Sequence, residues 1–471
     1  MKALLKKFST SPIAWLIILV VATSITSCKK ESFITDAAAQ LGISKDTIRF
    51  DTVFTSVGSI TQSFKIFNNN NQKLKLSSIQ LMGGNSSAYK LNVNGVASNM
   101  VNNIDIAAND SIYVFVTVNI NPTPTNVPFI VADSIAINYN GNKRFVQLEA
   151  FGKNAIFIRN GIINSNTTFN NNLPYVILGG LQINNGATLS INAGTKIYCH
   201  ANAPIIVNGT LLCNGNFFNP IIFSGDRLDA PYNTFPAAWP GIIFNSTSSN
   251  NQFTFTNINQ AYQAIVTNGP SPNSNPKLTL QQCIIDNAFD AGIHSNNSSI
   301  NANNCLISNC GSNIKIELGG TYNFTHCTVA SYSNNVLQHK KPTIFLSNSN
   351  VTAQTNNLNA TLRNCIFYGD AGFVNNEIET EKIGNAPYSI TIDHCLYRGV
   401  DPSNATIITS IKNIDPLFDS INNNTRFYDF NITKDANAPG INKGTNTSLL
   451  KDLNDKNRNV GLPDIGAYEK Q

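Results

Sequence analysis

A chain of 471 residues is long enough for two or three domains, and part of its formal net charge of +5 comes from lysines at positions 2, 6 and 7. Only 13% of the residues are charged, while Asn, Ser, Thr and Gly are abundant. This composition argues against a compact helical enzyme and, with no basic stripe, against nucleic-acid binding. It favours β-structure with many tight turns.

The first 27 residues have the organisation of a signal peptide. Three lysines precede an apolar stretch from Ile13 to Ala22, which is too short to cross a bilayer comfortably. Ile25-Thr26-Ser27-Cys28 follows and resembles the lipobox of bacterial lipoproteins, in which the cysteine thiol receives diacylglycerol. The resemblance implies cleavage before Cys28 and lipidation of Cys28. We therefore expect an outer-membrane lipoprotein of the Bacteroidota type in the cell envelope, with its orientation, periplasmic or surface-exposed, left open.

Residues 28–45 are predicted to form a polar, lipidated tether, and residues 46–152 a β-sandwich. In the second range short alternating runs such as Ser111–Val118 are separated by turn-rich segments, as in antiparallel sandwiches. The segment from Phe64 to Asn69 resembles the strand-to-turn segment of hydin-related Ig-like modules. A spacer that lifts the next domain from the membrane is the preferred interpretation, with binding through loops as the alternative.

Five later segments align without gaps on a central cysteine, with spacings of 22, 22, 38 and 30 residues. A nearly constant period with longer members indicates stacked coils with loop insertions. The residues five and three positions before each cysteine are apolar, as one inward strand face requires. Polar residues that tolerate a left-handed backbone directly precede each cysteine. These corner residues are Gln282, Asn304, His326, Asn364 and His394.

This pattern predicts a right-handed parallel β-helix over residues 153–410, and it resembles the pectate-lyase-like β-helix superfamily. The fold class is therefore all-β, a right-handed parallel β-helix preceded by an Ig-like β-sandwich. With one cysteine per coil, the thiols should stack as small apolar fillers. Disulfides between coils are geometrically conceivable, but a buried ladder of free thiols is favoured.

Residues 411–471 are predicted to cover the open end of the β-helix, where unpaired strand edges would otherwise be exposed. Short motifs occur in order here, from Asp415-Pro416-Leu417-Phe418 to Asp464-Ile465-Gly466-Ala467-Tyr468-Glu469. The series resembles the ending of choice-of-anchor Q proteins, β-helix proteins of bacterial surfaces. Where relatives often have Ser before Pro and Asp-x-Gly after it, this chain has Ala438 and Asn442-Lys443-Gly444.

The resemblance to the pectate-lyase-like superfamily implies lyase chemistry as one alternative. Polysaccharide lyases of that superfamily use a basic residue to take the proton α to a uronate carboxyl group, and bound calcium neutralises the charge of that carboxylate. Arg363 and Asp393 fall on one outward row of successive coils and are the candidate catalytic pair. A surface ion pair is the default interpretation, because no acidic cluster for calcium shares that face. His326 and His394 are interpreted as corner residues. We expect no cofactor, with calcium only if the protein is a lyase.

Three functions stay open. The first is noncatalytic binding of polysaccharide or another partner on a long Asn/Thr-rich face. The second is a polysaccharide lyase or glycoside hydrolase in the same groove, which the sparse carboxylates disfavour. The third is a structural spacer. The expected partners are a membrane, through the lipid, and polysaccharide, but no nucleic acid, and we expect a monomer.

Overall fold

The computed structural model of the chain describes residues 32–55, 58–121, 129–458 and 461–471. Over these residues the protein is all-β, and its only helices are the single 3-10 turns η1 (Gly84–Ser86) and η2 (Tyr232–Thr234). Within the described residues no helix has the length and apolarity needed to cross a membrane. The chain forms two compact units that divide at Lys153/Asn154. The predicted lipidation site, Cys28, lies outside the described residues.

The first unit is a sandwich of two sheets around one apolar core. The inward alternation predicted for β9 (Ser111–Val118) is present, since Ile112, Val114, Val116 and Val118 are buried. One sheet contains β1 (Phe33–Ile34), β5 (Lys73–Leu81), β8 (Met100–Ile106), β10 (Phe129–Tyr139), β11 (Asn142–Lys153) and β3 (Thr47–Phe54). The other contains β2 (Leu41–Ile43), β4 (Gln62–Asn68), β9, β6 (Tyr89–Val93) and β7 (Val96–Ala97).

The predicted tether of residues 28–45 differs from the structure, because part of it belongs to the sandwich. Phe33 of β1 pairs with Lys73, and Leu41 of β2 pairs with Asn68 and is buried. These strands are too short to show a period, so only their tertiary pairing defines them.

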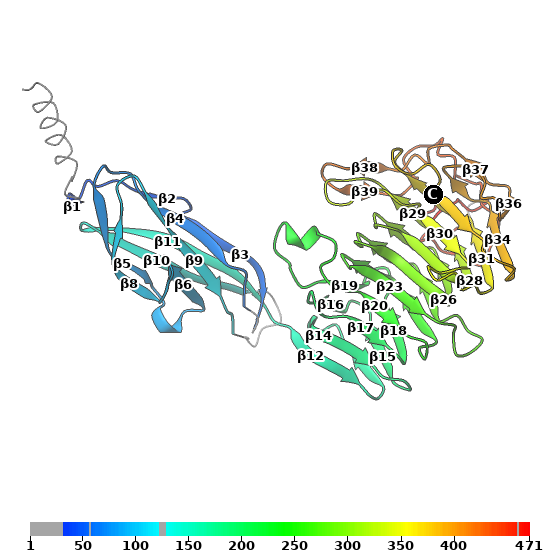
Figure 1. Cartoon of the computed structure of the whole chain (residues 1–471), viewed down its shortest axis with the longest axis horizontal. Helices are drawn as coiled ribbons and strands as arrows, with labels where there is room; N and C mark the ends of the chain where they lie inside the picture. The colour runs from blue at the N-terminus through cyan, green and yellow to red at the C-terminus, as the bar shows by residue number, and fades with distance from the viewer. Residues whose placement is uncertain (1–31, 56–57, 122–128, 459–460) are drawn as a thin grey trace, which may run out of the picture. The chain divides into compact units, whose positions relative to one another are not determined.

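The second unit is a parallel β-helix whose strands stack side by side from β12 to β37 (Figure 1). This confirms the predicted all-β class and the parallel β-helix. Each coil contributes strands to three faces, called A, B and C here, and β12 (Ile156–Ile163), β14 (Tyr175–Ile183), β26 (Ala291–Asn303) and β28 (Ile314–Thr325) each serve two of them. Face A comprises β13 (Thr167–Phe169), β15 (Thr188–Asn192), β18 (Thr210–Asn214), β21 (Asn251–Thr254), β24 (Leu278–Gln281), the second halves of β26 and β28, β31 (Leu358–Arg363), β34 (Tyr388–Asp393) and β36 (Thr406–Ile408).

Face B follows face A around a corner, and face C completes each coil. Face B comprises the first halves of β12 and β14, then β16 (Lys196–Cys199), β19 (Ile221–Gly225), β22 (Thr256–Asn259), β25 (Ile284–Asp286), β27 (Leu306–Ser308), β29 (Thr328–Ser331), β32 (Ile366–Gly369), β35 (Leu396–Tyr397) and β37 (Ile411–Lys412). Face C comprises the second halves of β12 and β14, β17 (Ile205–Val207), β20 (Ile242–Phe244), β23 (Gln263–Asn268), the first halves of β26 and β28, β30 (Ile344–Ser347) and β33 (Ile378–Glu381).

The five aligned segments are in register in the structure. Leu278, Ile300, Tyr322, Ala360 and Ile390 pair in succession along face A and point into one continuous core. The residue before each cysteine turns the corner between faces A and B with a left-handed backbone, as predicted. The φ values are 53° at Gln282, 52° at Asn304 and His326, 53° at Asn364 and 51° at His394.

The cysteines confirm the free-thiol interpretation. All eight described cysteines are free and buried, and burial raises the pKa of the Cys305 and Cys365 thiols well above the usual range. All eight act as small core residues, and five of them directly follow the five corners.

The C-terminal segment was predicted to cover the open end of the β-helix, but the structure places it elsewhere. It runs along the side of the stack over face B and the A–B corner row. Phe430, Leu453, Ala467 and Tyr468 form one apolar cluster with Leu306 and Ala330 of face B. The segment includes the two-stranded hairpin of β38 (Ser420–Asn422) and β39 (Phe427–Asp429). Strand exteriors on face B are therefore covered by apolar contacts rather than exposed.

Arg458 fastens this segment to the corner row. Its side chain is 1% exposed, lies 3.1 Å from Glu469 Oε2 and donates to the Asn304 side-chain oxygen at 2.9 Å and to the Gly466 carbonyl at 3.0 Å. The amide of Asn364 donates to the Thr445 carbonyl at 2.7 Å. The corner amides thus bind the segment, in addition to turning the chain.

Candidate functional site

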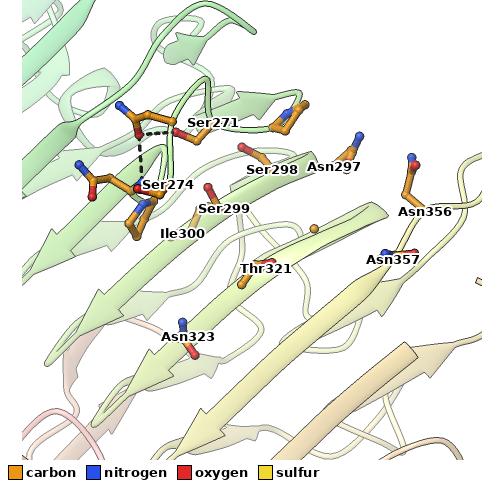
Figure 2. Close-up of a pocket in the computed structure, with 15 residues that line it drawn as sticks. Ser271, Ser274, Asn297, Ser298, Ser299, Ile300, Thr321, Asn323, Asn356 and Asn357 are labelled. Atoms are coloured by element: carbon orange, nitrogen blue, oxygen red, sulfur yellow. Dashed lines mark hydrogen bonds between the residues drawn. The ribbon is translucent and has the colours of Figure 1, made fainter. Parts of the chain in front are cut away.

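The clearest groove on the β-helix has a volume of about 650 Å³ and lies where face C turns into face A. No ionisable side chain lines it. Its walls are serine, threonine and asparagine, with proline, glycine and one isoleucine. Figure 2 shows the labelled side chains Ser298 and Ser299 on β26, Thr321 and Asn323 on β28, Ser271 and Ser274 on the loop along one side, and Asn356 and Asn357 on the segment before β31.

The groove opens onto the outward side of face A, which carries uncharged polar side chains in regular rows. Parallel pairing places identical positions of successive coils side by side, so one residue type repeats up the stack. One row consists of Thr279, Asn301, Asn323, Thr361 and Thr391. Such a surface offers alternating hydrogen-bond donors and acceptors without net charge.

A glycine pair shapes the floor of the groove. Gly319 and Gly320 adopt φ values of +73° and +122°, which side chains rarely tolerate. A Cβ on Gly320 would lie 2.3 Å from the carbonyl oxygen of Ser298, so only glycine lets the two coils approach here. Directly beneath, the buried Tyr322 hydroxyl accepts from the Ser298 amide at 3.1 Å and donates to the Gly319 carbonyl at 3.0 Å.

The loop of residues 269–277 forms one wall and is anchored at its base by Lys277. This lysine is fully buried, and its ammonium donates to the backbone carbonyls of Asn245 at 2.8 Å and Ser246 at 3.2 Å. Burial lowers the pKa of Lys277 to about 8. At the tip, the side-chain amides of Asn273 and Asn275 donate to Asn250 at 3.2 and 2.9 Å. The wall is therefore preorganised.

Ser298 lies in the groove lining with an unsatisfied hydroxyl. The residue is 2% exposed, and its Oγ has no hydrogen-bond partner among the described residues. A buried hydroxyl without a partner costs about 1–3 kcal/mol. A ligand hydroxyl in the groove would be a suitable partner.

The candidate catalytic pair from the sequence is adjacent in the structure. Arg363 and Asp393 pair across β31 and β34, with Arg363 Nε 2.8 Å from Asp393 Oδ2. His394 Nδ1 lies 2.6 Å from the other carboxylate oxygen. Both oxygens of Asp393 are therefore engaged by neighbours. The pair stands on face A, where Arg363 lies beside Thr325, and neither residue is part of the groove lining.

A histidine cluster on face C was not anticipated from the sequence. His294 Nε2 lies 2.9 Å from Glu317 Oε2, Lys315 lies 2.7 Å from the same oxygen, and Gln263 Nε2 lies 3.3 Å from His294 Nδ1. Burial opposes ionisation of Glu317, but the hydrogen bonds from Lys315 and His294 outweigh it and lower its pKa. Both ring nitrogens of His294 thus have hydrogen-bonding neighbours.

Within the described residues, no group of three or more His, Cys, Asp or Glu side chains is arranged to hold a metal ion.

Sequence reasoning missed most of the groove because it followed only the outward row two positions before each cysteine. The groove residues of β26 and β28 lie four and six positions before a cysteine, at Ser299, Thr321 and Asn323. The Pro- and Asn-rich run from Pro270 to Pro276 was a usable signal, because it inserts a rigid polar loop between coils.

No protein-family model matches the sequence. No curated protein matches it either. Among solved structures, a family 123 glycoside hydrolase from Clostridium perfringens shares 12% identity over 28% of this chain and 30% of its own, with a TM-score of 0.19. An ASH/PapD-like domain of human CEP192 shares 8% identity over 27% of this chain and 91% of its own, with a TM-score of 0.18. This chain thus spans about 30% of the hydrolase. Neither score is high enough to indicate fold or function.

Proposed function

We propose that the protein is a noncatalytic, glycan-binding lipoprotein of the cell envelope that holds an uncharged polysaccharide along face A. The observation that supports this most directly is the groove of about 650 Å³ whose lining contains no ionisable side chain. Sugar hydroxyls both donate and accept hydrogen bonds, as the amides and hydroxyls of the lining do. Lipid on Cys28 would anchor the protein to a membrane.

Uncharged ligands are favoured because the groove lining contains no charged side chain. A uronate carboxylate entering it would lose water without meeting a cation, and burying an unpaired charge is costly. Lys277, at the base of the loop wall, is fully buried, and backbone carbonyls already bind its ammonium.

The second candidate function is a lyase or hydrolase acting at Arg363 and Asp393. The observation in its favour is that Arg363, Asp393 and His394 form one hydrogen-bonded series on the outward side of face A. The engaged carboxylate argues for an ion pair instead, since catalysis needs a group free to exchange a proton.

The test is an array of neutral and uronate-containing glycans, with turnover assays, on the purified protein. Asn323→Ala should weaken neutral-glycan binding roughly three- to tenfold, because one neutral hydrogen bond is lost. Asn404→Ala, the same change in an exposed turn, is the matched control and should leave binding unchanged.

Other outcomes separate the alternatives. Turnover of uronate substrate that Arg363→Ala abolishes would establish the enzyme and reject the noncatalytic proposal. If the protein showed no glycan binding and no turnover, the spacer function would remain. If Asn323→Ala left the binding of neutral glycans unchanged, the groove would be rejected as the binding site.

A further inference from the structure

A second cavity, of about 220 Å³, lies on a different side of the β-helix from the groove. Three segments that are distant in the sequence form it. The loop between β19 and β20 contributes Thr234, the face-B strands and the corners after them contribute Asp286 and amide side chains, and the hairpin β38–β39 contributes Arg426 and Tyr428. The docked C-terminal segment thus supplies one wall.

Asp286 supplies a hydrogen-bond acceptor in this cavity. It lies between Asn259 and Ser308 in the face-B register, and Ser308 Oγ donates to its Oδ1 at 2.6 Å. Burial raises the pKa of Asp286 to about 6, against the lowering effect of hydrogen bonds from Ser308 and Asn309. The group is therefore mainly a carboxylate at neutral pH, which accepts hydrogen bonds and donates none.

Arg426 supplies donors from the hairpin wall. Its guanidinium donates to the Thr234 carbonyl at 3.1 Å and the Thr234 hydroxyl at 2.5 Å, and the Thr234 carbonyl also accepts from Asn287 at 2.9 Å. A guanidinium has five N–H donors, so others remain for a ligand. Loop, coil and hairpin are tied together before any ligand arrives, which reduces the entropic cost of binding.

We propose that this cavity binds a single neutral sugar ring, separately from any glycan on face A. Vicinal hydroxyls of such a ring would donate to Asp286 and accept from Arg426, while the surrounding amides do both. One carboxylate and one guanidinium leave the cavity without a large net charge. An acidic sugar would bring a second carboxylate toward Asp286, while part of the donor capacity of Arg426 is already taken by Thr234, so neutral sugars should be preferred.

The test is saturation-transfer NMR and calorimetry on the purified protein with glucose, galactose, mannose and N-acetylglucosamine, and with glucuronate as the acidic probe. At least one neutral sugar should bind, and Asp286→Asn should weaken it at least about tenfold, since a charged hydrogen bond is lost. Asp455→Asn, the same change at an exposed position of the C-terminal segment, should have no effect.

Arg426→Gln, on the hairpin, provides a second variant in case Asp286→Asn perturbs folding. Ser298→Ala, in the groove on face A, should leave monosaccharide binding intact, which separates this proposal from the proposed function. Absence of binding by every neutral sugar, tighter binding of glucuronate, or binding insensitive to both Asp286→Asn and Arg426→Gln would overturn the proposal.

Discussion

His339 is held between two carboxylates that the sequence places far from it. Its Nδ1 lies 3.1 Å from Asp370 Oδ1, and its Nε2 lies 3.2 Å from Glu377 Oε2. Glu377 is buried and also forms an ion pair with Arg398. No sequence spacing indicates this cluster, because the partners come from different coils. Burial alone would lower the pKa of His339, but the two carboxylates outweigh it and raise the pKa to about 9.

This arrangement predicts a pH dependence of stability. The folded protein holds the His339 proton up to about pH 9, whereas the unfolded chain releases it near 6.5. Its contribution is therefore complete below about pH 6.5 and is lost as the pH rises through about 9, by up to roughly 3 kcal/mol. We expect the unfolding free energy to fall between these limits, and the fall to be smaller in His339→Gln. Urea denaturation at several pH values checks this, and equal slopes in both proteins would contradict it.

At the scale of elements, one buried ion pair helps to hold the C-terminal segment, in addition to the apolar cluster over face B. Arg458→Met leaves Glu469 as an uncompensated buried charge, because both side chains are only 1% exposed. Removing one partner of a buried pair costs about 3–5 kcal/mol. Chemical denaturation and limited proteolysis should show loss of stability and release of residues 414–471.

The double variant Arg458→Met with Glu469→Gln should recover part of that loss, since the unpaired charge is removed. Lys451→Met, at an exposed lysine on the same segment, should be nearly neutral. Wild-type stability of the single Arg458 variant would show that apolar contacts alone hold the segment.

At the scale of the whole molecule, the reactivity of the buried thiols measures whether the β-helix is folded. The described cysteines lie inside the stack, and all eight are buried and free. We expect a thiol reagent such as Ellman's reagent to react with none of them in the native protein, and with all eight after denaturation. Reaction should follow the loss of circular dichroism. Rapid labelling of the native protein would contradict the packing.

The repeating part of this protein could be predicted from its amino-acid pattern alone. Parallel coils place equivalent residues in register, so the sequence repeats with a nearly constant period. That period showed the apolar alternation and the corner residue before Cys283 and the equivalent cysteines, and it indicated the all-β class. The adjacency of Arg363 and Asp393 followed from the same register.

The features that interrupt the repeat became visible only in the folded protein. The groove needs the loop of residues 269–277 beside Gly320, and the second cavity needs the hairpin against Asp286. The C-terminal segment lies along face B, whereas the sequence pattern predicted a cover over the open end. These contacts join residues separated by variable distances in the chain. Their energies depend on burial and close approach, which local sequence patterns do not encode.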